Sequence, residues 1–168
     1  PDDLAEGGES IILSLTENPA YQIDTPSTAT AEITDRPFSD WLHSSGLVSP
    51  GDDDDHDGTP NIVEYYMGTR GDQSSSLTSI QLASVSNGSF VATFHRSKKA
   101  IDVSGNVQWS SGLKTWHGSG ESDGSRTASV VTRRISPSGD DPELLEATLT
   151  ITAGQPTKVL FMRIAVSD

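Results

Sequence analysis

The stretch Leu145-Glu-Ala-Thr-Leu-Thr-Ile-Thr152, closed by Ala153-Gly154, is typical of the segments that decide the fold class of this chain. It is a short strand candidate rich in β-branched residues and bounded by a turn signal. The other strand candidates in this region are residues 80–85, 90–95, 107–110, 128–134 and 159–166. Glycine-containing turn signals lie between them. Short strands at such spacing indicate a sandwich or barrel, and we expect an antiparallel β-sandwich over residues 77–168.

Upstream of that region, residues 53–64 carry oxygen ligands at the spacing of a calcium-binding loop. Calcium takes about six to eight oxygen ligands, and an EF-hand loop supplies them from positions 1, 3, 5, 7, 9 and 12, with Gly at position 6. Only a loop starting at Asp53 places Gly at position 6 and Glu at position 12. The candidate ligands are Asp53, Asp55, Asp57, the Thr59 carbonyl, Asn61 and Glu64. The alternative is a solvated acidic loop, which is what runs of like charge usually form.

The segments beside this loop predict two short helices. Residues 37–45 can form two helical turns before Gly46 and the Ser49-Pro-Gly51 break, and residues 61–67 form a helix that ends at Gly68. Pro60 at position 8 has no N–H, so it cannot form the backbone bridge that pairs two such loops. The pattern D-x-D-x-D-G-x-x-N-x-x-E-Y resembles the solitary calcium loops of extracellular bacterial proteins and of thrombospondin type 3 repeats. This resemblance implies a structural clamp rather than a calcium sensor.

The first 35 residues contain two further strand candidates. Alternation places Ile11, Leu13 and Leu15 on one face of the first strand, and we expect Ala29, Ala31 and Ile33 of the second to face inward. Together with Asp2-Asp-Leu-Ala-Glu-Gly-Gly-Glu9, they resemble the closing strands of a Calx-β domain, a calcium-binding β-sandwich. The resemblance implies acidic ligands at Asp3, Glu6, Glu9 and Asp35. The earlier strands of that sandwich are missing, so we expect either a piece of a longer protein or completion by a neighbouring chain.

Three phrases of the C-terminal region carry another resemblance. They are Phe94-His-Arg-Ser-Lys-Lys-Ala-Ile-Asp-Val103, Val107-Gln-Trp-Ser-Ser-Gly-Leu-Lys-Thr-Trp116 and Phe161-Met-Arg-Ile-Ala-Val166. In this order they resemble the β module that ends many large secreted proteins of Verrucomicrobia and Planctomycetes. The resemblance spans residues 37–168. It implies an extracellular or cell-surface location and no particular activity.

Composition limits the classes of partner and the size of any single core. The 168 residues carry a formal net charge of −13, which argues against nucleic acid and anionic membranes as partners. There is no cysteine, and no apolar run approaches the roughly 20 residues that cross a bilayer. Because only 33% of residues are hydrophobic, one large core is not expected. We therefore expect a mainly β chain with an incomplete Calx-β-like part (1–35), a helix-loop-helix calcium motif (36–69), a linker (70–76) and the sandwich (77–168).

Catalytic motifs are lacking in the sequence. The histidines His43, His56, His95 and His117 are far apart, and no hydrolase, zinc-protease or phosphate-loop motif is present. We therefore expect no enzymatic activity.

Trp109 and Trp116 could form a platform for a sugar ring, but large aromatics in a small β domain more often pack into the core. The basic residues Arg96, Lys98, Lys99, Arg133 and Arg134 are either outward strand residues or a surface for an acidic polysaccharide or an acidic neighbouring subunit.

These observations predict a calcium-stabilised structural or adhesive region of a large extracellular bacterial surface protein. One form of this hypothesis is a filament or sheath subunit completed by strands from a neighbouring identical chain. The other expected partners are upstream domains of the same parent protein, and polysaccharide. The alternative hypothesis is a carbohydrate-binding accessory module of a secreted hydrolase.

Overall fold

The computed structural model describes residues 9–75, 80–86, 88–155 and 159–168. Within these ranges the chain is mainly β, and every strand and helix expected from the sequence is present with small shifts at its ends. The N-terminal part contains β1 (Glu9–Ser14), β2 (Thr28–Ile33), α1 (Pro37–Ser44) and α2 (Asn61–Met67). The C-terminal part contains β3 (Gln81–Ser86), β4 (Ser89–Arg96), β5 (Ser104–Ser110), β6 (Arg126–Arg134), β7 (Glu143–Gly154) and β8 (Phe161–Ser167).

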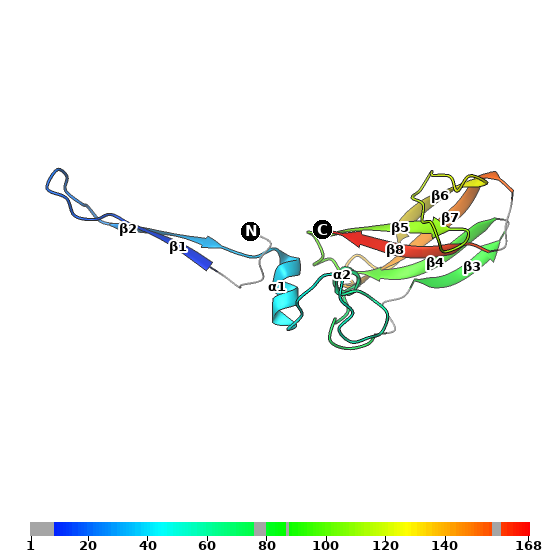
Figure 1. Ribbon diagram of the computed structural model, residues 1–168, viewed down its shortest axis with the longest axis horizontal. Coiled ribbons are helices and arrows are strands. Elements are labelled where there is room, and N and C mark those ends of the chain that lie inside the picture. Colours follow the sequence, from blue (N-terminus) through cyan, green and yellow to red (C-terminus); the bar gives the residue numbers. More distant parts are fainter. Residues whose placement is uncertain (1–8, 76–79, 87, 156–158) are drawn as a thin grey trace.

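The six C-terminal strands form the expected antiparallel sandwich. One sheet has the order β3-β4-β7-β6 and the other contains β5 and β8, which lie over the larger sheet in Figure 1. The central strands alternate because one face of the larger sheet is buried and the other is not. Phe90, Ala92 and Phe94 of β4 are buried, as are Leu145, Ala147 and Leu149 of β7.

Trp109 lies at the centre of one part of the core. Its side chain is fully buried with Phe90, Ala128 and Leu149. Its indole N–H donates to the Gly118 carbonyl at 3.0 Å, so the polar atom of the ring is satisfied inside the protein. The expected packing of Trp109 in the core is confirmed.

A second part of the core joins the two helices to the end of the sandwich. Its buried members include Phe38 and Leu42 of α1, Tyr65, Tyr66 and Met67 of α2, and Phe94, Val107 and Leu145 of the strands. Helix α2 ends at Gly68, whose φ of 79° is the left-handed conformation that glycine adopts most easily. The Gly68 N–H donates to the carbonyls of Glu64 and Tyr65, which caps the helix as the sequence predicts.

Strands β1 and β2 form an antiparallel ribbon that projects from the α1 end, away from the sandwich (Figure 1). The register pairs Ile11 with Ala31 and Leu13 with Ala29, so these apolar side chains share one face of the ribbon. The expectation that Ala29 and Ala31 face inward is wrong for this chain, because both are exposed. Alternation defines which residues share a face, but it does not supply the layer that would cover that face.

Candidate metal centre

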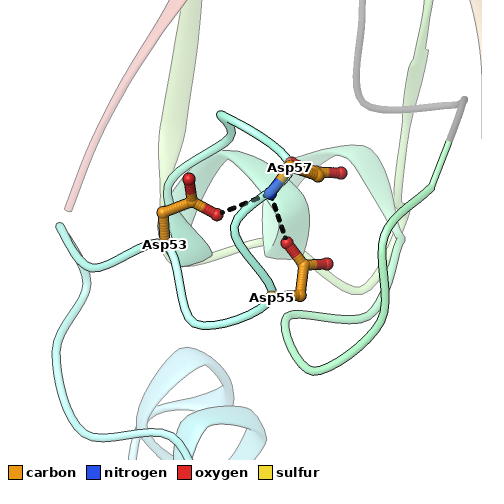
Figure 2. A group of neighbouring side chains, drawn as sticks. All are labelled: Asp53, Asp55 and Asp57. Carbon is orange, nitrogen blue, oxygen red and sulfur yellow. Dashed lines mark hydrogen bonds between the residues drawn. The ribbon is translucent and has the colours of Figure 1, made fainter.

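The loop between α1 and α2 gathers three carboxylates. Ligand atoms of Asp53, Asp55 and Asp57 all lie within 4.8 Å of one another, so this cluster can hold a metal ion. Figure 2 shows how the loop is closed: the Asp57 N–H donates to Asp53 Oδ1 at 3.1 Å and to Asp55 Oδ1 at 3.0 Å. The next residue, Gly58, has a φ of 94° and donates its N–H to Asp53 Oδ2 at 2.9 Å. A glycine is favoured at this position because side chains rarely tolerate such a φ.

The segment after α2, interpreted from the sequence as a linker, contacts this loop. Asp57 Oδ2 accepts the Ser75 N–H at 3.2 Å, and Asp57 Oδ1 accepts the Thr59 N–H at 2.9 Å. Gly71 is buried in the same region. A Cβ added to Gly71 would collide with Leu47 and would lie 3.0 Å from both Asn61 Oδ1 and the Trp41 ring. Residues 70–75 therefore pack against the loop and its neighbouring helices.

Glu64 is the strongest electrostatic feature of the site. Its side chain is fully buried on α2, and Oε2 has no hydrogen-bond partner among the described residues. Thr69 Oγ1 lies 3.4 Å from the other oxygen, a long contact that satisfies it only weakly. The pKa of Glu64 is raised to about 8. Burial is the largest cause, and the negative charges of Asp55, Asp57 and Asp53 contribute to the same increase. The Glu64 carboxylate is not among the ligand atoms that lie within 4.8 Å of one another, and a cation that it shared with the aspartates would remove both penalties.

Two more buried oxygens near the cluster lack partners in the described part of the chain. One is Asp55 Oδ2 and the other is Asn61 Oδ1. The Asn61 amide is fixed because its Nδ2 donates to Ser49 O at 2.8 Å and to Asp54 Oδ2 at 2.7 Å. This arrangement leaves the oxygen as the unsatisfied atom, but it lies against Gly71. The roles of Asn61 and of the Thr59 carbonyl as ligands stay predictions.

Asp102 is a residue whose role the sequence does not indicate. It accepts the Tyr65 hydroxyl at Oδ1 (2.9 Å) and the Phe38 N–H at Oδ2 (2.9 Å), so it links both helices to the loop between β4 and β5. Arg36 also donates to its carbonyl. These contacts join residues more than 30 positions apart in the chain, and no local pattern carries them.

Only two of the four residues implied as a second calcium site by the Calx-β resemblance lie in the described ranges. Asp3 and Glu6 lie outside the described residues. Glu9 is the first residue of β1 and is paired in register with Ile33, while Asp35 is buried just beyond β2. Among the described residues, the loop aspartates are the one group of at least three potential ligands that meets the distance criterion for a metal. The second site stays a prediction.

The other candidate binding residues are largely engaged within the protein. Trp116 is half-buried, and the Arg163 guanidinium lies over its ring, 4.5 Å from the centroid. Arg96 and Arg134 both form ion pairs with Glu143, and Arg133 pairs with Glu146 across neighbouring strands. These three arginines therefore stabilise the sheet.

The loop with the aspartate cluster thus sits beside two short helices at the end of a β-sandwich. No helix in the described ranges is long and apolar enough to cross a membrane. Comparison of the chain with protein-family models, with curated proteins and with solved structures found no match.

Proposed function

We propose that residues 53–64 bind calcium and that the chain is a calcium-stabilised structural module of an extracellular protein. The observation that carries the proposal is the fully buried Glu64 carboxylate, which has an unpartnered oxygen and whose pKa the charges of the three aspartates help to raise. An acidic cluster alone is common on protein surfaces. A buried, uncompensated carboxylate under the negative charge of such a cluster is costly unless it is protonated or bound to a cation.

The donor set favours calcium over other metals. Carboxylate and carbonyl oxygens suit hard cations, whereas zinc prefers imidazole and thiolate. The chain has no cysteine, and the His56 ring in this loop contacts the Asp53 carbonyl through Nδ1 at 2.7 Å. Magnesium demands a smaller octahedral shell and keeps several waters. A segment that offers carboxylates from four positions is a better match for calcium.

Bound calcium would connect the loop to the hydrophobic core. Glu64 lies on α2, and the next three residues of this helix, Tyr65, Tyr66 and Met67, are buried against α1 and the sandwich. A cation shared by Glu64 and the loop aspartates therefore fixes the helix that joins the other elements. This is the role of a clamp. A sensor would need helices that are free to open.

An extracellular setting agrees with the chemistry of such a site. Calcium is abundant outside cells, so even a weak site with a dissociation constant of about 10⁻⁴–10⁻³ M would be occupied. The acidic composition and the lack of cysteine fit a surface protein that is stabilised by metal rather than by disulfides. The burial of Trp109 and the arginine over Trp116 favour this structural role over a sugar-binding platform.

Thermal unfolding in calcium and in chelator tests the proposal. With 10 mM calcium and the affinity given above, binding should add about 1.4–2.7 kcal/mol to the free energy of unfolding. The Asp55→Ala variant should lose most of this gain, because it removes a clustered ligand. Asp52→Ala is the matched control, since it removes the same charge from an exposed neighbour outside the cluster. Equal melting temperatures of the unmodified chain in calcium and chelator would refute the proposal.

A further inference from the structure

We propose that the free edge of β5 accepts the β1–β2 ribbon of a second copy of this chain. The inference names a partner for the structural role proposed above. It rests on that structural role and does not depend on which metal is bound. Three features carry it: an open strand edge beside a groove, an amphipathic ribbon with an uncovered face, and a contrast in charge between the two.

The open edge follows from the hydrogen-bond pattern of β5. In the described part of the chain β5 pairs with β8 on one side, and on the other side it makes only an isolated bridge. In that bridge Trp109 and His117 exchange two backbone hydrogen bonds of 2.9 Å. Because antiparallel strands alternate their bonding direction, Val107 and Gly105 present their N–H and C=O groups to the same edge. An added strand can bind there.

A groove runs along this edge. One hollow of about 630 Å³ is lined by apolar residues, among them Phe94, Val107 and Val130, and by polar and charged ones, among them Arg96, Glu121 and Thr132. A second hollow of about 570 Å³ shares Tyr66 and Gly105 with the first and continues past Ser104. The inner face of β6 changes from buried at Ala128 to exposed at Thr132, so the small sheet leaves part of the large sheet uncovered.

The ribbon has the complementary pattern. Ile11 and Leu13 share one face with Ala29 and Ala31, and both larger residues are exposed, Leu13 by 69%. The opposite face carries Ser10, Ile12, Ser14, Thr28, Thr30 and Glu32. The Leu15 N–H donates to Ser27 O, so by alternation the even-numbered residues of β1 direct their backbone groups to its outer edge. Strand β1 can therefore bond to β5 as a parallel strand, because only this orientation places Ile11 and Leu13 on the same face as Val107, toward the groove.

The charges of the two parts favour this contact between copies. Residues 9–33 contain four acidic side chains and no Lys or Arg. Residues 80–168 contain nine Lys and Arg residues and eight Asp and Glu residues, so this part of the chain is nearly neutral. Docking of the acidic ribbon on the nearly neutral sandwich avoids the repulsion that two acidic ribbons would experience. Because the ribbon points away from its own sandwich (Figure 1), the groove it fills belongs to another copy. Such a head-to-tail contact generates open chains.

Paired variants test each side of the contact. On the ribbon, Leu13→Asp should raise the dissociation constant for self-association about thirtyfold or more, the loss typical of a central buried side chain. Its control is Ile12→Asp on the opposite face, which is similarly exposed at 63%. In the groove, Thr132→Trp should fill the acceptor site, and Val131→Trp on the outer face of β6 is the control. Sedimentation velocity over a concentration series measures the association, and the melting temperature verifies folding.

A mixing experiment gives the sharpest outcome. Leu13→Asp retains an intact groove and Thr132→Trp retains an intact ribbon. Each variant alone should stay monomeric, whereas an equimolar mixture should form dimers and nothing larger. If Leu13→Asp prevents assembly but Thr132→Trp assembles like the unmodified chain, the ribbons pair with each other and the β5 site is refuted. A chain that stays monomeric at millimolar concentration also overturns the inference.

The two proposals fail in different ways. Self-association is measured in excess calcium and again in chelator, beside the melting curves described above. If the mixture forms head-to-tail dimers but its melting temperature does not depend on calcium, the β5 site is supported and the calcium clamp is refuted. If the melting temperature depends on calcium but the chain never self-associates, the calcium clamp is supported and the β5 site is refuted.

Discussion

At the scale of single residues, Glu64 is the side chain whose environment is least favourable without a metal. Glu64→Gln keeps its shape and removes its charge. Above about pH 8, where the carboxyl with its raised pKa is ionised, the variant in chelator should melt higher than the unmodified chain. In calcium it should melt lower, because a ligand charge is lost. Paired calorimetric scans measure both. Equal destabilisation in calcium and chelator would show that Glu64 serves packing alone.

The linkage sign for Glu64 follows from the direction of its shift. Its pKa in the folded chain lies above the ordinary value of 4.5, so the metal-free folded state binds more protons than the unfolded state between those values. Stability of the metal-free protein therefore falls as pH rises from about 4.5 to about 8. Protonation and calcium are alternative ways of neutralising the same carboxylate.

The aspartate cluster could be predicted from sequence because its three members lie within five consecutive positions, where spacing largely determines their geometry. The gathering of Asp53, Asp55 and Asp57 needs only the local turn at Gly58. Gly71 and Asp102 could not be predicted, since their roles depend on contacts with distant residues such as Leu47 and Phe38. Long-range packing decides those positions, and a single sequence does not display it.

At the scale of elements, the first residue of β7 joins three strands. Glu143 is buried and accepts from Arg96 on β4 and from Arg134 on β6. The hydrogen bond from Arg96 is the main reason that the pKa of Glu143 is lowered. A lowered pKa adds stability above the ordinary value, and this stability is lost as pH falls through the folded value.

Glu143→Gln should therefore lower the midpoint of urea unfolding at pH 7, and the difference from the unmodified chain should shrink at pH 3. Glu146→Gln is the control on the same strand, because it breaks the more exposed pair with Arg133. It should change the midpoint less at pH 7. A difference for Glu143→Gln that persists unchanged at pH 3 would mean that the charge of Glu143 contributes nothing.

The alternation of apolar residues was sufficient to predict the strands, but it was insufficient to predict which strand faces are buried. The alternation of Leu145, Ala147 and Leu149 and that of Ile11, Leu13 and Leu15 are equivalent in the sequence. The first set is in the core, whereas the second is exposed on the ribbon. What covers a face is a property of the fold or of an assembly, and local pattern carries no information about it.

At the scale of the whole molecule, α1 and α2 connect the ribbon, the aspartate loop and the sandwich. Helices of eight and seven residues are too short to be stable alone, so they depend on the core cluster around Tyr65 and Met67 and on the loop. The sandwich has its own ladder, in which β7 pairs with β4 and with β6. We therefore expect a bound metal to stabilise the two helices more than the sandwich.

Calcium removal should destabilise α1, the aspartate loop and α2, which together form the joint of the molecule, before it destabilises the sandwich. Amide hydrogen exchange in chelator should show lower protection in α1, in residues 53–64 and in α2 than in calcium, while β4 and β7 keep their protection. The reason is that chelation restores the repulsion between Glu64 and the loop aspartates, which acts on α2 directly and on the sheet only through packing. The Asp55→Ala variant in calcium should reproduce the chelator pattern. Uniform loss of protection through β4 and β7 would instead show that joint and sandwich open as one cooperative unit, with the metal stabilising the entire fold.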